Sequence, residues 1–275
     1  MPAFFFISGL CSNFRKDTKS FLISIFKSLV IPLFALSVIA DAINALVLHQ
    51  DLLIVLLSTI TKGGTLWFLQ ALILSKIICY LICKMTDSRI FMLSITLFLL
   101  TFAVALNQFN IGSNPFHYQH GLVASFFVAL GLFAKENTVI YEKLMSISLW
   151  LYPMVGIITF WYSPSFTAYL SVSLKLIPLF LVLSICGTLF LLAICKKFNT
   201  CRFFEHWGKN SFVVYGLHFV PYVFFFKTLY VWMRPTCGVS FFFFLAFLFA
   251  AEYTFCYMLM SLFQYKPFKW MLGRF

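Results

Sequence analysis

Long apolar runs recur along the whole chain, and they constrain its fold more than any other feature. Each full run is close to the roughly 20 residues that an α-helix needs to cross a bilayer core of about 30 Å. With 62% hydrophobic and 10% charged residues, the composition is not that of a soluble domain. A β-barrel would instead show short segments of alternating polarity. We therefore predict an all-α polytopic membrane protein of about nine transmembrane helices, at residues 2–14, 21–43, 65–83, 90–106, 118–134, 144–162, 168–195, 210–232 and 237–262.

The first of these runs, residues 2–14, is too short to span. As a helix it would reach about 20 Å. The polar residues that follow, Arg15 to Lys19, mark one membrane surface. Met1 would then lie within the hydrocarbon, where a charged amino group is costly. We expect that one further N-terminal helix is missing from this chain; a half-inserted or interfacial helix is the alternative.

Basic residues fall almost entirely on alternate loops. One set of loops holds fourteen of the 20 Lys and Arg residues, and the other set holds only Lys62 and Arg234. The positive-inside rule then places the richer set, and with it the C-terminus, on the cytoplasmic side of the cell's inner membrane. The formal charge of +12 is thus spread over loops and forms no nucleic-acid-binding face. No linker or repeat interrupts the runs, so residues 1–275 are predicted to form a single transmembrane domain.

Known soluble-enzyme motifs are absent from the sequence. It contains no G-x-S-x-G, no H-E-x-x-H and no glycine-rich phosphate loop. Most of the eight cysteines lie in or beside apolar runs and none forms C-x-x-C, so we expect neither a disulfide framework nor a metal site. His117 and His120, in the polar loop 107–120, are a weak metal signal. The amides and aromatic rings of this loop suit a sugar, or simply an interfacial loop.

The last two runs form a predicted hairpin that turns near Pro235. His218 lies 17 residues before this proline and Glu252 lies 17 residues after it. In two antiparallel helices, equal offsets mean equal depth, here about 25 Å from the turn. A carboxylate facing an imidazole orients the ring and makes it more basic. The pair is a candidate catalytic site, and a structural hydrogen-bonded pair is the alternative.

Five short motifs occur in order along the chain. They are FFFISG at residues 4–9, VIPLF at 30–34, LWFLQAL at 66–72, VALGLF at 128–133 followed by Lys135, and GKNS at 208–211 followed by Tyr215 and His218. Together with the basic stretch Arg15–Lys19, they resemble motifs of the acyltransferase-3 family of integral membrane O-acyltransferases. The resemblance is greatest to the branch that includes sugar O-acetylases of surface polysaccharides.

This resemblance implies that an acetyl or other acyl group moves from acyl-CoA, usually acetyl-CoA, to a hydroxyl of a cell-surface polysaccharide or lipid-linked glycan. Acyl-CoA, the glycan and the lipid bilayer are then the expected partners, with no bound cofactor and no nucleic acid. The family's general base is a histidine of a first span that this chain lacks, so we expect the chain as it stands to be inactive. His218 and Glu252 are the candidate catalytic residues that remain. The candidate substrate-binding residues are Arg15, Lys16 and Lys19 for the CoA phosphates, and Asn210, Ser211 and Tyr215.

Two other functions stay open at this point. The nine predicted spans and the expected further N-terminal one make ten, and ten spans with buried charges also fit a transporter or flippase for polysaccharide precursors. However, we find none of the paired repeats that are frequent in transporters. A non-catalytic remnant that kept the acyltransferase fold is the third reading, because a fold does not guarantee its chemistry.

Overall fold

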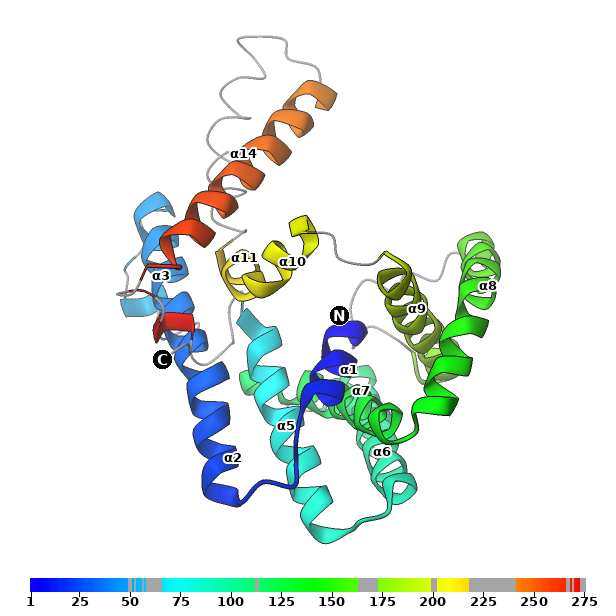
Figure 1. Ribbon diagram of the computed structural model, residues 1–275. Coiled ribbons are helices and arrows are strands. Elements are labelled where there is room, and N and C mark those ends of the chain that lie inside the picture. Colours follow the sequence, from blue (N-terminus) through cyan, green and yellow to red (C-terminus); the bar gives the residue numbers. More distant parts are fainter. Residues whose placement is uncertain are drawn as a thin grey trace. The chain divides into compact units, whose positions relative to one another are not determined.

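The computed structural model describes residues 1–48, 51, 53–55, 57, 66–111, 114–162, 173–198, 202–217, 241–265, 268 and 270–272. Over these residues the chain is helical and contains no strand, which confirms the all-α prediction (Figure 1). The chain divides into two compact units. Unit 1 comprises Met1–Thr18 and Gln70–Thr200, and unit 2 comprises Lys19–Leu69 and Cys201–Phe275.

Unit 1 is built around one helix, α7. Its helices are α1 (Pro2–Cys11), α5 (Trp67–Met85, in this unit from Gln70 on), α6 (Arg89–Gln108), α7 (Tyr118–Glu136), α8 (Thr138–Tyr162) and α9 (Ile177–Lys197), with single turns at Pro115–His117 and Leu174–Leu176. α7 packs against both α1 and α6, and α8 packs against α9. Most residues of α7 are therefore buried, including the polar Gln119 and Ser125.

Two glycines allow α1 and α7 to touch backbone to backbone. A Cβ on Gly9 would overlap the carbonyl oxygen of Val128 and lie 3.1 Å from the Cα of Gly131. A Cβ on Gly131 would overlap the carbonyl oxygen of Phe6 in turn. Small residues permit such close helix approach in membranes, where packing takes over from the hydrophobic effect as the force between helices. Each glycine belongs to one of the family-like motifs at residues 4–9 and 128–133, which the structure brings together at this crossing.

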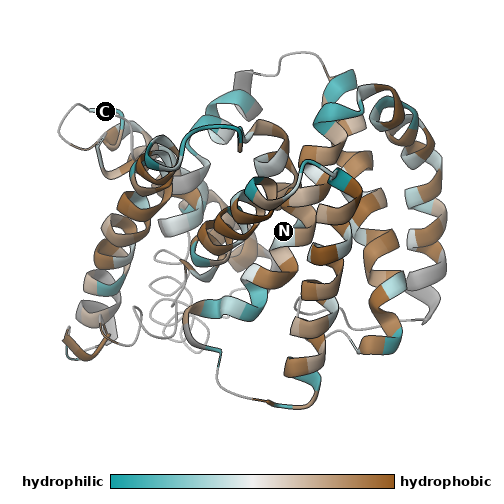
Figure 2. Ribbon diagram, turned by 90° about the horizontal axis from the view of Figure 1, so that it is seen from below, coloured by the Kyte–Doolittle hydropathy of each residue, from teal (hydrophilic) through white to brown (hydrophobic). Residues whose placement is uncertain are grey.

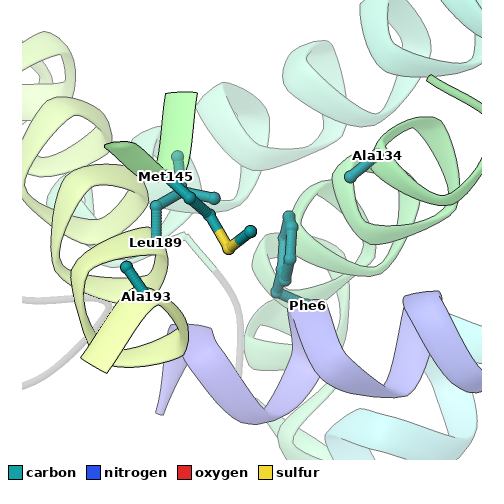
Figure 3. Close-up of a cluster of buried hydrophobic side chains, with 5 residues drawn as sticks. All are labelled: Phe6, Ala134, Met145, Leu189 and Ala193. Atoms are coloured by element: carbon teal, nitrogen blue, oxygen red, sulfur yellow. The ribbon is translucent and has the colours of Figure 1, made fainter. Parts of the chain in front are cut away.

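Beside the glycine crossing, four helices share a buried apolar cluster (Figure 3). Phe6 of α1 lies among Ala134 of α7, Met145 of α8, and Leu189 and Ala193 of α9. Phe6 is 2% exposed, and its ring also contacts Tyr141 with a centroid distance of 6.1 Å. The cluster connects α1 to the α8–α9 pair, so α1 is packed on two sides despite its length of ten residues.

Unit 2 contains one long interrupted helix and several shorter pieces. Its elements are α2 (Thr18–Ile25), a π-helix (Phe26–Val30), α3 (Ile31–Leu48), α10 (Arg202–Lys209), α11 (Ser211–Leu217), α14 (Phe241–Leu262) and a turn at Trp270–Leu272. The π-helix ends two residues before Pro32, which has no N–H and would crowd the carbonyl of Ser28 in a regular α-helix. α11 packs against α3 and α14, with Gly216 directly against Leu36.

Five described helices are long and apolar enough to cross a membrane, and six are if α7 and α8, bent by 114° at Asn137, count as one broken span. Figure 2 shows hydrophobic residues along the helices and hydrophilic ones mainly near their ends. Large apolar side chains such as Phe98, Trp150 and Phe243 are exposed, as expected for contact with lipid. The count of nine spans stays a prediction, because the run 210–232 and the loop before α9 lie largely outside the described residues.

Candidate functional site

A cavity of about 630 Å³ lies in unit 1, where the loop after α1 meets the ends of α5, α6 and α7. We call it the basic pocket. Four basic and two acidic side chains line it, so its formal charge is +2. The lining residues are Ser12, Asn13, Phe14, Arg15, Cys83, Lys84, Asp87, Arg89, Leu132, Lys135 and Glu136.

Arg89 and Glu136 form the central ion pair of the basic pocket. Arg89 donates from Nε and Nη2 to the two carboxylate oxygens of Glu136, at 2.8 and 2.9 Å. This is the bidentate geometry that planar guanidinium and carboxylate groups prefer. Arg89 Nη1 also donates to the Cys83 thiol at 3.3 Å, so its direction is fixed on both sides. Ser88 supports this position because its hydroxyl caps the first turn of α6.

Arg15 extends from the loop between α1 and α2 and approaches the same carboxylate. Its Nη2 lies 3.8 Å from Glu136 Oε1, and its side chain is 83% exposed. A surface pair of this kind contributes little stability. The Arg15 guanidinium is therefore available to an anion that enters the pocket.

The structure separates the three cations that the sequence grouped as a phosphate site. Arg15 lines the basic pocket, whereas Lys16 and Lys19 are exposed and are not among its lining residues. Lys16 contributes its backbone carbonyl, which accepts a hydrogen bond from the Tyr80 hydroxyl. Lys19 belongs to unit 2.

The pocket has three further cations, Lys84, Arg89 and Lys135, and the sequence analysis assigned none of them to substrate binding. Lys84 and Arg89 flank the short connection between α5 and α6, and Lys135 lies near the end of α7, on the same predicted side of the membrane. The charge asymmetry between loops was thus the one signal that could have grouped them. It gave the side of the membrane but not the positions around the pocket.

In unit 2, Asn210 and Tyr215 hold α11 in place. The Asn210 carbonyl accepts from the Val213 and Val214 N–H groups, and its Nδ2 donates to the His206 carbonyl at 2.9 Å. Asn210 is 3% exposed. The half-buried Tyr215 ring meets Phe68 edge to face at 5.3 Å. Ser211, also half-buried, begins the helix between them. A substrate-binding role for these three residues remains a prediction.

Glu252 occupies the middle of α14, where it is half-buried with Cys256 one turn further on. Trp207 of α10 stacks on the neighbouring Tyr253 at 5.1 Å. A carboxyl at the centre of an apolar helix is costly in a membrane and usually has a function. Its proposed partner His218 lies outside the described residues, so the pairing also remains a prediction.

α10 is polar and lies outside the predicted spans. Lys209 Nζ lies 2.6 Å from Glu205 Oε1, one turn away on the same helix. The Lys209 ammonium lowers the pKa of Glu205 below its usual value by hydrogen bonding and by charge attraction. Both side chains are more than half exposed, so this pair belongs to the surface and adds no reactive group to a site.

Comparison with known families identifies the chain. A sequence model of the acyltransferase-3 family, described as an acyltransferase domain, matches residues 1–261. The chain belongs to the acyltransferase-3 family. This confirms the relationship predicted from the five motifs. Comparisons with curated proteins and with solved structures give no match.

Membership in the acyltransferase-3 family supports O-acyltransferase activity in general, and with it an acyl donor and an acceptor. The apolar helices show that the chain is a multi-pass membrane protein, for which the bilayer is a further partner. Two of the family motifs end at the basic pocket, because α1 leads into its loop wall and α7 supplies Leu132, Lys135 and Glu136.

Proposed function

We propose that the chain is a membrane O-acyltransferase whose basic pocket binds acyl-CoA, acetyl-CoA in the first instance. The acyl group would move to a hydroxyl of a cell-surface polysaccharide or of a lipid-linked glycan. The pocket would face the cytoplasm, where acyl-CoA is found, in an inner membrane with the C-terminus on the same side.

The observation that carries this proposal is the charge of the basic pocket in a chain of this family. CoA bears a diphosphate and a 3′-phosphate, and arginine and lysine are the side chains that bind phosphate best. The pocket volume of about 630 Å³ is within the range of small-molecule sites. Arg15 and Lys84 are the cations best suited to the phosphates, since Arg89 is already engaged by Glu136.

The reaction needs a base as well as a donor site. The acceptor hydroxyl oxygen attacks the thioester carbonyl, the C–S bond breaks, CoA leaves as its thiolate, and the hydroxyl proton passes to a base. Loss of a general base typically costs 10²–10⁴-fold in rate. His218 with Glu252 is our candidate for that base, with Asn210, Ser211 and Tyr215 as candidates to hold substrate.

Donor binding is the first test of this proposal. The full chain would be purified in lipid nanodiscs, and its affinity for CoA measured by isothermal titration at several salt concentrations. We expect binding that weakens as salt rises, and weaker binding of dephospho-CoA, which lacks the 3′-phosphate. An affinity that is independent of both salt and the 3′-phosphate would refute the basic pocket as the donor site.

Transfer is tested separately with labelled acetyl-CoA and a glycan fraction as acceptor. Label in the glycan would support the whole proposal. Salt-dependent CoA binding without transfer would identify a non-catalytic member of the family. Exchange of glycan precursor across vesicles without any acyl-CoA would instead favour the transporter reading.

A further inference from the structure

The loop Ser12–Thr18 connects α1 to α2 and forms one wall of the basic pocket through its first four residues. A hydrogen bond from α7 holds the first residue of this loop. Lys135 Nζ donates to the Ser12 carbonyl oxygen at 2.9 Å. Ser12 is the C-cap of α1, where the partial negative charge of a helix end attracts a cation. The contact is therefore a charge-assisted hydrogen bond.

The other end of the loop is tied down by α5. The Tyr80 hydroxyl donates to the Lys16 carbonyl oxygen at 3.3 Å and lies 3.0 Å from Thr18 Oγ1. A carbonyl oxygen can only accept and a phenol has only one proton, so when both contacts are made Tyr80 donates to Lys16 and accepts from Thr18. Tyr80 is 4% exposed, which means that packing fixes the ring that carries this hydroxyl.

Between the two ties the loop presents Arg15. The Arg15 backbone N–H donates to Asn13 Oδ1 at 3.1 Å, which makes a local turn, and the Phe14 side chain between them is buried. Among the residues that the structure describes, only Glu136 forms an ion pair with the Arg15 side chain, at 3.8 Å. The direction in which its guanidinium extends therefore depends on where the loop backbone is held.

We propose that Tyr80 and Lys135 are positioning residues, which hold the loop Ser12–Thr18 so that Arg15 faces the donor phosphates. The functional part of this inference rests on the donor site proposed above, but the holding of the loop does not. Tyr80 is not among the residues that line the basic pocket. An effect of its hydroxyl on donor binding must therefore act through the loop.

The loop is tested by labelling Cys83, which lines the same pocket as the loop. The full chain in nanodiscs is treated with N-ethylmaleimide, and the tryptic peptide 77–84 is followed by mass spectrometry. Cys79 is fully buried and lies in the same peptide, so it reports any general loosening. Tyr80→Phe removes one oxygen and keeps the ring, including its contact with the Lys84 ammonium. We expect Cys83 to label roughly 3–10-fold faster, as for the loss of one hydrogen bond that holds the loop closed.

Lys135→Met should also make Cys83 label faster. Lys135→Arg should keep the slow labelling rate of the parent chain, because arginine is also a charged donor. Two matched controls, Lys143→Met and Tyr152→Phe, remove an equal charge and an equal hydroxyl outside the pocket. We expect both controls to label like the parent chain. Unchanged labelling in Tyr80→Phe and Lys135→Met would overturn the inference, as would faster labelling of Cys79 together with Cys83.

CoA affinity measured on the same samples separates this inference from the donor-site proposal. Weaker CoA binding by Tyr80→Phe, with Tyr152→Phe unchanged, supports both. If the parent chain binds no CoA while the labelling pattern holds, the donor site is wrong and the positioning of the loop stands. If CoA binds with equal affinity to the parent and to Tyr80→Phe, the role in positioning Arg15 is overturned.

Discussion

The crossing of α1 and α7 makes the sharpest prediction about stability. In Gly131→Ala, the added Cβ would overlap the Phe6 carbonyl oxygen and lie 3.0 Å from the Leu10 nitrogen. Ordinary contacts between carbon atoms lie at about 3.5–4.0 Å. Every one of these neighbours is backbone, so no side chain can rotate away and the helices must separate.

The cost follows from what a separation would disturb. Overpacking of a filled interior costs about 1–3 kcal/mol, and we expect the upper end because the adjacent Phe5 and Phe6 are 1% and 2% exposed. About 3 kcal/mol corresponds to a fall in Tm of roughly 6–12 °C for a chain of this size. Gly9→Ala should cost a similar amount. The double variant should cost less than the sum, because helices that have already separated admit the second methyl.

Thermal unfolding in detergent, followed by intrinsic fluorescence, measures this effect. Gly156→Ala is the matched control, since a Cβ there would meet nothing within 4 Å. Ala is also favoured over Gly inside a helix by about 0.5–1 kcal/mol, so the control should be as stable as the parent or slightly more stable. Equal Tm values for Gly131→Ala and Gly156→Ala would refute the close crossing.

Three further predictions concern the charged groups. Glu136→Gln raises the formal charge of the basic pocket to +3 and should tighten CoA binding with a steeper salt dependence; looser binding in titration calorimetry would show that the carboxylate serves mainly to hold Arg89. Arg89→Lys keeps the positive charge but loses the bidentate hydrogen bonds to Glu136. Titration calorimetry should therefore show weaker CoA binding although the net charge of the pocket is unchanged. Glu252→Gln should abolish acetyl transfer without changing CoA affinity, and retained transfer would remove Glu252 from the catalytic pair.

Much of the fold was predictable because membranes limit the choice of structure so strongly. The runs at 65–83, 90–106 and 118–134 became α5, α6 and α7 with ends that differ from the prediction by at most two residues. The run 144–162 began earlier, at Thr138, because the polar start of α8 continues the helix beyond the apolar segment. The run 2–14 ended at Cys11, where the chain leaves the helix at Ser12.

The candidate site was predictable only in part. Sequence reasoning assigned Arg15 to the donor because it lies in a basic cluster, and the structure does put Arg15 at the pocket. It grouped Arg15 with Lys16 and Lys19 for the same reason. Neighbours in a loop can face different directions, and hydropathy has no information about direction.

The amino-acid sequence by itself determined the class of protein, the approximate helix limits, the alternation of charge between loops and the family. These properties depend on transfer of local segments between water and lipid, which is additive along a chain. Only the tertiary structure decided that Gly9 meets Gly131, that Tyr80 and Lys135 hold one loop, and that Arg89 pairs with Glu136. Such contacts depend on the rotation of each helix about its axis and on which helices are neighbours. Packing among residues far apart in sequence decides the rotation and the neighbours of each helix, and a local sequence pattern does not contain this information.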